Sequence, residues 1–232
     1  MVNEQQPDSY TGEVSPGGAP DVRRLGCLTV TKVAVDPDMS NNCYLLHCSE
    51  ADELVLVDAA AEPERLLELI GDRTLSAVVT THQHWDHHRA LAAVVAAHPG
   101  ASVVAGEPDA DAIEEQTGVA VARRVGDGDT VAVGTCELGV VRLTGHTPGS
   151  IALLLDDPSV SEHPHLFTGD SLFPGGPGRT TSPADFTSLM DDLEAKVFDR
   201  LPDATWFYPG HGNDSTLGAE RASLPEWRAR GW

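Results

Sequence analysis

The chain has 232 residues, of which 41% are hydrophobic, and its 36 acidic residues against 15 Lys and Arg give a formal net charge of −21. This composition is typical of a globular protein with a sizeable core, and it argues against binding to nucleic acid, whose phosphate backbone requires cationic contacts. No stretch approaches the roughly 20 apolar residues that span a bilayer, so no membrane association is expected.

The N-terminal stretch is polar and rich in Pro, Gly and acidic residues. It contains no basic segment followed by an apolar one, so it does not resemble a secretory signal, and a cytoplasmic protein is expected. We predict that residues 1–24 are a mobile tail and that 25–232 form one domain.

Four cysteines occur without any C-x-x-C pair. In a chain of this size they are expected to be buried or reduced thiols, and the spacing does not predict a zinc–thiolate site. They are Cys27, Cys43, Cys48 and Cys136.

The first half of the chain alternates predicted strands with predicted helices. Apolar residues at helical spacing predict helices at 62–70, ended by Gly71, and at 88–98, ended by Pro99 and Gly100. Runs rich in β-branched and apolar residues predict strands at 28–35, 43–47, 54–57 and 75–81.

The second half is mainly β. Runs at 119–125 and 130–133 flank a Gly-Asp-Gly-Asp turn, as in a β-hairpin, and an apolar stripe predicts a helix at 184–201. This succession predicts a layered α/β architecture in which sheets pack face to face with helices outside. The remaining predicted strands are 138–143, 151–155, 166–168 and 205–208.

Four metal-ligand side chains lie within six residues, directly after the strand at 75–81: His82, His84, Asp86 and His87. Residues two apart in extended backbone point the same way, so the first two histidines can approach one metal ion together. The other two lie where the chain turns into the next helix and can face a second position. Packing rarely requires such a run, which therefore predicts a metal site.

Three more candidate ligands follow apparent strand ends. His146 lies in G-H-T-P-G-S, Asp170 in T-G-D-S-L-F and His211 in P-G-H-G. Adjacent glycines allow close approach of the backbone, and imidazole with carboxylate suits zinc, iron or manganese. The other histidines are expected to be structural or solvated: His47, His88, His98, His163 and His165.

These motifs, in this order and over residues 25–211, resemble those of the metallo-β-lactamase superfamily, specifically its glyoxalase-II-like (hydroxyacylglutathione hydrolase-like) branch. A Val-Asp pair at 57–58 belongs to the same pattern. The resemblance implies an α/β fold of the αββα sandwich type, with two packed mixed β-sheets, helices on the outer faces and the metals at one edge of the sheets.

The resemblance also implies two divalent metal ions, with zinc expected and iron or manganese as alternatives. The first ion would be held by His82, His84 and His146, and the second by Asp86, His87 and His211, with Asp170 bridging both.

Two further residues match the family pattern. Asp58 would support the ligands from below, or it is simply a turn residue at a strand end. Arg179, in a Gly-Arg pair, would orient its loop or face a substrate carboxylate; the alternative is an exposed loop arginine.

The activity implied is hydrolysis of an acyl thioester, a small-molecule substrate. A hydroxide bridging two metals about 3.5–4 Å apart would attack the carbonyl carbon, with Asp170 and Asp86 as the catalytic residues. A thiolate leaving group needs little protonation, which suits this set of side chains. Trp85, Phe173 and Pro174 are candidate pocket residues, with ordinary packing as the alternative.

Two features depart from glyoxalase II. About 20 residues follow His211, whereas full-length glyoxalase II adds a helical substrate-binding domain, so glutathione recognition is not implied. Pro177 stands where the branch often has cysteine. The alternatives are a lactonase-type ester hydrolase, which keeps all seven ligands, and a persulfide dioxygenase with a single iron, in which Asp-Phe typically follows Gly-Arg-Thr rather than Thr181-Ser182. Oligomeric state is not indicated by the sequence.

Overall fold

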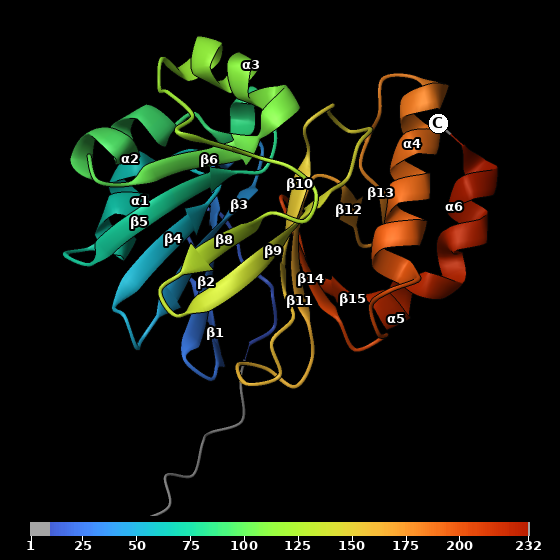
Figure 1. Cartoon of the computed structure of the whole chain (residues 1–232), viewed down its shortest axis with the longest axis horizontal. Helices are drawn as coiled ribbons and strands as arrows, with labels where there is room; N and C mark the ends of the chain where they lie inside the picture. Colours follow the sequence, from blue (N-terminus) through green and yellow to red (C-terminus); the bar gives the residue numbers. More distant parts are fainter. Residues whose placement is uncertain (1–9, 232) are drawn as a thin grey trace, which may run out of the picture.

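Two β-sheets pack face to face, and helices cover the outer face of each in a computed structural model that describes residues 10–231 (Figure 1). Helices α1 to α3 lie outside the first sheet, and α4 and α6 lie outside the second. The four layers are therefore αββα, which confirms the predicted fold class.

The first sheet has seven strands in chain order, antiparallel from β1 to β4 and parallel from β4 to β7. Parallel neighbours require crossover connections, and α1, α2 and α3 supply them. The strands are β1 (Asp21–Leu25), β2 (Leu28–Val35), β3 (Asn41–Cys48), β4 (Glu53–Val57), β5 (Thr74–Thr80), β6 (Ser102–Gly106) and β7 (Arg123–Val125).

The second sheet has the order β15-β14-β11-β10-β9-β8, and only β11 and β14 are parallel. A small ribbon of β12 and β13 follows β11. The strands are β8 (Thr130–Val133), β9 (Cys136–Arg142), β10 (Ile151–Leu155), β11 (His165–Gly169), β12 (Leu172–Phe173), β13 (Gly176–Pro177), β14 (Trp206–Pro209) and β15 (Ser215–Thr216).

The helices are short, and none within residues 10–231 is both long and apolar enough to span a bilayer. They are α1 (Pro63–Ile70), a 3₁₀ turn (Trp85–His87), α2 (Leu91–Ala97), α3 (Glu107–Thr117), α4 (Pro183–Asp192), a π turn (Leu193–Phe198), α5 (Leu217–Glu220), a 3₁₀ turn (Arg221–Ser223) and α6 (Leu224–Arg230).

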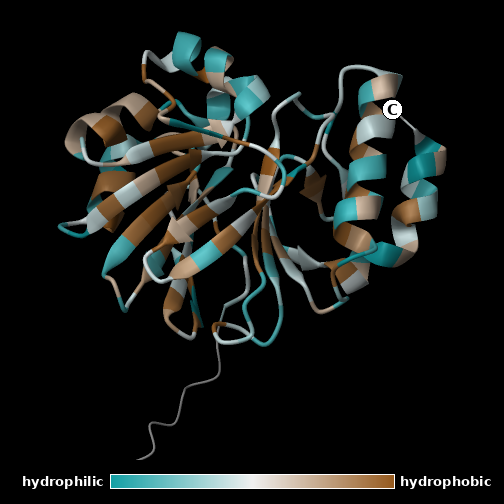
Figure 2. Ribbon diagram, viewed as in Figure 1, coloured by the Kyte–Doolittle hydropathy of each residue, from teal (hydrophilic) through white to brown (hydrophobic). Residues whose placement is uncertain are grey.

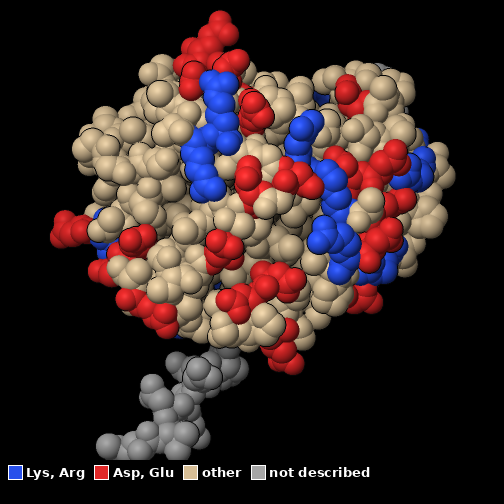
Figure 3. Space-filling model, in the orientation of Figure 1, with Lys and Arg blue, Asp and Glu red and all other residues tan. Residues whose placement is uncertain are grey.

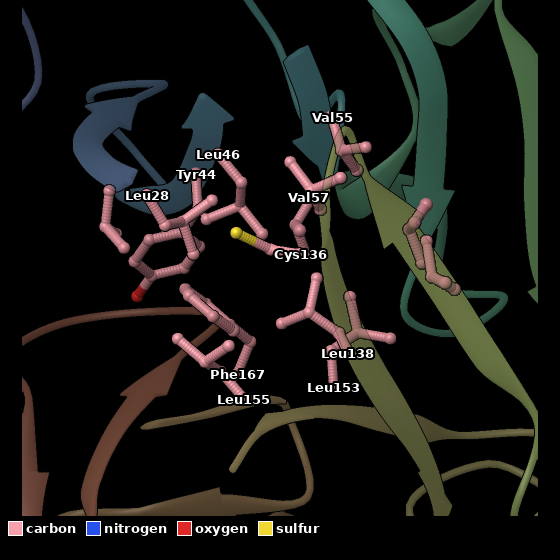
Figure 4. Packing of buried hydrophobic residues seen from close by; sticks show 14 of the residues in the cluster. Leu28, Tyr44, Leu46, Val55, Val57, Cys136, Leu138, Leu153, Leu155 and Phe167 are labelled. Carbon is pink, nitrogen blue, oxygen red and sulfur yellow. The ribbon is translucent and has the colours of Figure 1, made fainter. Parts of the chain in front are cut away.

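Three apolar layers hold the sandwich together. The central layer lies between the sheets, where Tyr44, Leu46 and Phe167 pack closely (Figure 4), and the other two lie under the helices on each side. Alternation along β5 shows how one strand serves two layers: Val79 enters the central layer and Val78 the layer under the helices. Apolar residues accordingly recur along the strands, while the helices carry polar residues as well (Figure 2).

Two predicted elements need correction. The runs at 119–125 and 130–133 do not form a hairpin, because β7 pairs with β6 in the first sheet while β8 pairs with β9 in the second. The turn between them crosses from sheet to sheet, and Gly128 N–H donates to the Val140 carbonyl at 2.9 Å.

The helix predicted at 184–201 changes to a π turn at residue 193. Strand β6 and helix α3 were not predicted from the sequence.

The predicted start of the fold near residue 25 is also corrected. Strand β1 begins at Asp21, and Tyr10 is already buried and donates a hydrogen bond to Asp214 at 2.6 Å. The backbone oxygen of Gly12 accepts from the buried ammonium of Lys32 at 2.6 Å. Residues 10–24 therefore pack on the sandwich, and the rest of the predicted tail, residues 1–9, lies outside the described residues.

The face seen in Figure 3 carries both signs of charge. Acidic side chains are spread over it, and the basic ones gather in two groups, one beneath α3 and one beside α4. This face consequently presents no continuous basic surface.

Candidate metal centre

All seven predicted ligands meet at one end of the sandwich. The run at 82–87 follows β5 of the first sheet, while His146, Asp170 and His211 lie on loops of the second sheet, after β9, β11 and β14. Three groups of ligand atoms each lie within 4.8 Å of one another. They are His82, His84 and His146; His82, His87 and Asp170; and Asp86, His87 and His211.

The first group has the spacing of a tetrahedral metal site. His82 Nε2 lies 3.1 Å from His84 Nδ1 and 3.3 Å from His146 Nε2. Zinc–nitrogen bonds of about 2.0–2.1 Å in a tetrahedron place two ligand nitrogens about 3.3 Å apart. Burial, reinforced by neighbouring His87, holds the pKa of His82 well below its ordinary value, so the imidazole is in the neutral form that binds metal.

Asp170 lies between the first and last groups. Its Oδ1 is 3.4 Å from His87 Nε2, and its Oδ2 is 3.5 Å from His211 Nε2 and 3.7 Å from His146 Nε2. Asp86 Oδ2 is 3.5 Å from His87 Nε2 and 3.4 Å from His211 Nε2. The Asp170 carboxylate therefore contacts imidazoles of both the first and the last group, as a ligand that bridges two metal ions would.

Two buried atoms at the centre, His87 Nε2 and Asp170 Oδ1, lie 3.4 Å apart but make no hydrogen bond within residues 10–231. Buried polar atoms are nearly always hydrogen-bonded, so these two indicate that a cation belongs between them. Burial alone would raise the pKa of Asp170, but His87 and the hydrogen bond to His211 hold it well below its usual value. The ionised carboxylate is the form that binds a metal, and the residues present therefore fit the implied ions.

Four of the five histidines are oriented by a hydrogen bond from Nδ1 to a group outside the centre. This arrangement fixes the tautomer and turns each Nε2 inwards. The pairs are His82 with Thr81 Oγ1 (3.0 Å), His87 with Asp58 Oδ2 (2.9 Å), His146 with the Arg179 carbonyl (2.6 Å) and His211 with the Met39 carbonyl (2.9 Å).

Asp58 lies beneath the ligands and is almost fully buried. Besides the bond from His87, it accepts hydrogen bonds from the backbone N–H and the hydroxyl of Thr81, both at 2.8 Å. Its φ of 59° shows that it also occupies a left-handed turn, which Asp tolerates better than most residues. Both readings of Asp58 thus apply: it turns the chain and it orients a candidate ligand.

Replacing Asp58 with Asn is expected to weaken metal binding by about 10–100-fold, the range measured when such orienting carboxylates are removed. Both Asp58 oxygens accept hydrogen bonds from His87 and Thr81, and an asparagine would replace one of these oxygens with an NH₂ group, which cannot accept. Competition with a chromophoric chelator measures the affinity, and Asp52→Asn, at a side chain that is 74% exposed, is the matched control. Wild-type affinity in folded Asp58→Asn would show that Asp58 does not position the centre.

Two supporting residues were not singled out from the sequence. Asn41 Nδ2 donates to Asp86 Oδ2 at 2.9 Å. Buried Asp109, at the start of α3, joins two ligand loops, because it accepts from the backbone of Gln83 (2.9 Å) and Gly149 (2.7 Å) and from the hydroxyl of Thr147 (2.5 Å). Neither residue belongs to a motif, so only the three-dimensional contacts reveal them.

Glycines allow the loops to approach this closely. A Cβ at Gly210 would lie 2.2 Å from Asp170 Oδ1, and one at Gly178 would lie 1.7 Å from the Asp170 carbonyl. Larger residues at either position would displace the carboxylate or its loop.

A pocket of about 350 Å³ lies beside the loop that carries Arg179, whose carbonyl accepts a hydrogen bond from His146. It is lined by Arg179, Arg230 and Phe186 among others, and both arginine side chains are exposed. The backbone carbonyl of Arg179 accepts the hydrogen bond from His146 Nδ1, while its exposed side chain lines the pocket. Trp85 is 54% exposed and stacks with Arg89, with its ring centroid 4.7 Å from the guanidinium carbon, so it is not a core residue.

Known proteins resemble the chain over most of its length. Residues 36–211 match the family model of the Metallo-beta-lactamase superfamily. The chain is 35% identical to a hydroxyacylglutathione hydrolase of Polaromonas sp. over 170 residues, which are 72% of this chain and 60% of that protein. It is 30% identical to hydroxyacylglutathione hydrolase GloC of Haemophilus influenzae over 202 residues, which are 79% of this chain and 91% of that one.

Among solved structures, the crystal structure of TTHA1623 in a di-iron-bound form superposes with a TM-score of 0.68 and 31% identity, over 84% of this chain and 98% of that one. The alignment thus spans less than two thirds of the Polaromonas protein but nearly all of the other two proteins.

Proposed function

Because the chain belongs to the metallo-beta-lactamase superfamily, we propose that it is a metal-dependent hydrolase whose substrate is an acyl thioester. The observation that carries the proposal is the convergence of seven His and Asp side chains into adjoining groups, with Asp170 between them. The thioester is supported by relatives named hydroxyacylglutathione hydrolase.

In this proposal His82, His84 and His146 would hold one ion, His87, His211 and Asp86 would hold the other, and Asp170 would be a ligand of both. Zinc fits this donor set, and the similar di-iron structure makes iron the main alternative. When bound, such a pair of ions supplies a Lewis acid for the carbonyl oxygen and lowers the pKa of water towards about 7.

The protein's own groups would position the reactants and handle the proton. Burial works to raise the pKa of Asp86, but hydrogen bonds with His211 and Asn41 and the charge of His87 lower it overall, so its carboxylate is ionised. Asp86 Oδ2 faces the centre, where it can accept a hydrogen bond from the attacking water and orient it. A thiolate leaves without protonation near neutral pH, whereas an alkoxide needs a proton donor. This difference favours a thioester over an ordinary ester.

The two arginines of the adjoining pocket are proposed to bind a carboxylate on the thiol carrier. Arg179→Ala is then expected to raise KM for a carboxylate-bearing thioester roughly tenfold, since a hydrogen bond to a charged group contributes about 1.5–3 kcal/mol. The kcat should change little. The comparison substrate is an uncharged thioester of the same acyl group, for which KM should stay constant, and Arg124→Ala, remote from the pocket, is the control variant. An equal rise in KM for both substrates would exclude carboxylate recognition.

The proposed activity is tested by following hydrolysis of lactoyl thioesters by the metal-loaded protein, with His84→Ala as the control. Turnover well above the control is expected. Turnover no greater than that of His84→Ala would reject thioester hydrolysis, and faster hydrolysis of lactones would identify an ester hydrolase instead. Oxygen consumption with a persulfide substrate, in protein that holds one iron per chain, would identify a dioxygenase instead of a hydrolase.

A further inference from the structure

Three of the four cysteines meet at the end of the sandwich opposite the candidate metal centre. Cys27 lies in the turn between β1 and β2, Cys48 ends β3 and Cys136 begins β9. Strand β3 begins at Asn41 beside the candidate centre and ends at Cys48, and its eight residues span about 23 Å. The cysteine cluster is therefore a separate place in the molecule.

The three sulfur atoms are close enough to share one ion. They lie within 4.8 Å of one another, and the Sγ atoms of Cys27 and Cys136 are 3.0 Å apart. Cys48 and Cys136 are buried and Cys27 is half-buried; Cys136 reaches into the apolar layer between the sheets (Figure 4). Zinc–sulfur bonds of about 2.3 Å place tetrahedral thiolates about 3.8 Å apart, so the cluster needs a shift of less than about 1 Å.

Hydrogen-bond donors already surround one of the sulfurs. The backbone N–H groups of Thr135, Ala51 and Glu50 point at Cys48 Sγ, and the hydroxyl oxygen of Thr135, which donates to Glu50 Oε2 at 2.7 Å, lies 3.4 Å from that sulfur. Burial would raise the pKa of the Cys48 thiol, but these hydrogen bonds lower it to about 6.

The neighbouring thiol behaves in the opposite way. Burial and the adjacent sulfurs of Cys27 and Cys48 raise the pKa of Cys136. Three thiolates cannot be ionised side by side without a cation, and a bound cation removes that cost.

From this geometry we propose that Cys27, Cys48 and Cys136 form a second metal site, for an ion that prefers thiolate ligands, such as Zn²⁺ or Cu⁺. Binding forms three metal–sulfur bonds, and every thiol that is still protonated releases its proton to solvent. The ion would tie the β1–β2 turn and β3 of the first sheet to β9 of the second. The site does not depend on the proposed hydrolase activity.

Cobalt(II) titration of the reduced full-length protein tests the proposal. Thiolate ligation gives a sulfur-to-cobalt charge-transfer band in the near ultraviolet, which the imidazole and carboxylate ligands of the other centre cannot give. We expect the band to saturate at one equivalent of thiolate-bound cobalt per chain. Cys27→Ser, at the half-buried position, should reduce the band or weaken binding at least tenfold while leaving thioester hydrolysis unchanged.

Cys43 supplies the matched control, because it is buried in the first sheet outside the cluster. Cys43→Ala should retain the band, and circular dichroism checks that each variant is folded. A reduced wild-type protein without the band would overturn the proposal, as would a band that persists in both Cys27→Ser and Cys136→Ser. A Cys27–Cys136 disulfide found by mass spectrometry in place of metal binding would identify a redox pair and equally reject the metal site.

Discussion

Asp170→Asn is expected to lower kcat/KM for thioester hydrolysis by roughly 10³-fold, because metal-assisted stabilisation of the transition state is worth several kcal/mol and each 1.4 kcal/mol is about tenfold in rate. Within residues 10–231, Asp170 is the only carboxylate that contacts imidazoles of both the first and the last group of ligand atoms. The amide keeps the shape of the side chain but removes the charge that would hold both ions. Metal content should fall together with activity.

Asp111→Asn provides the control, because this carboxylate is 84% exposed on α3 and pairs only with Arg124 among the described ion pairs. Its kcat/KM and metal content should equal those of the wild type. A decrease of less than tenfold in Asp170→Asn, with both ions still bound, would show that the bridging position is not essential.

Asp214→Ala is expected to lower the free energy of unfolding by about 3–5 kcal/mol, the loss seen when one partner of a buried ion pair is removed. Lys32 and Asp214 have fully buried side chains and lie 2.6 Å apart. Burial lowers the pKa of Lys32 and raises that of Asp214, while their mutual attraction opposes both shifts. Without Asp214 the Lys32 ammonium keeps only two backbone carbonyl acceptors. The Tyr10 hydroxyl and the Trp206 indole N–H also lose the carboxylate to which they donate.

Thermal and urea unfolding measure this effect, which should lower Tm by roughly 10 °C in a chain of this size. Asp111→Ala, which breaks an exposed pair, should cost less than about 1 kcal/mol. The double variant Lys32→Met/Asp214→Leu should recover much of the loss, because it leaves no unpaired charge buried. A loss below 1 kcal/mol in Asp214→Ala would show that the pair does not stabilise the fold.

The parts of the fold that the sequence predicts correctly are those with a strong local signal. The β-branched run that becomes β5 and the apolar stripe of α4 are examples. The hairpin at 119–133 is wrong because the same local turn can join strands of one sheet or of two, and long-range pairing with β6 and β9 decides between them.

The same distinction applies to the candidate sites. His82, His84, Asp86 and His87 are adjacent in the chain, so their shared role is visible in the sequence. Asp109 acts through contacts with residues 26 to 40 positions away, and no motif marks it. The cysteine cluster likewise joins three distant turns and strand ends, which is why spacing did not predict it.

The proposed centre holds two ions where the ends of the two sheets meet. Anomalous diffraction from crystals of the metal-loaded protein tests it most directly. We predict two peaks about 3.5–4 Å apart, one beside His82, His84 and His146, the other beside Asp86, His87 and His211, with Asp170 contacting both. A single peak, or none, among these seven residues would contradict the account.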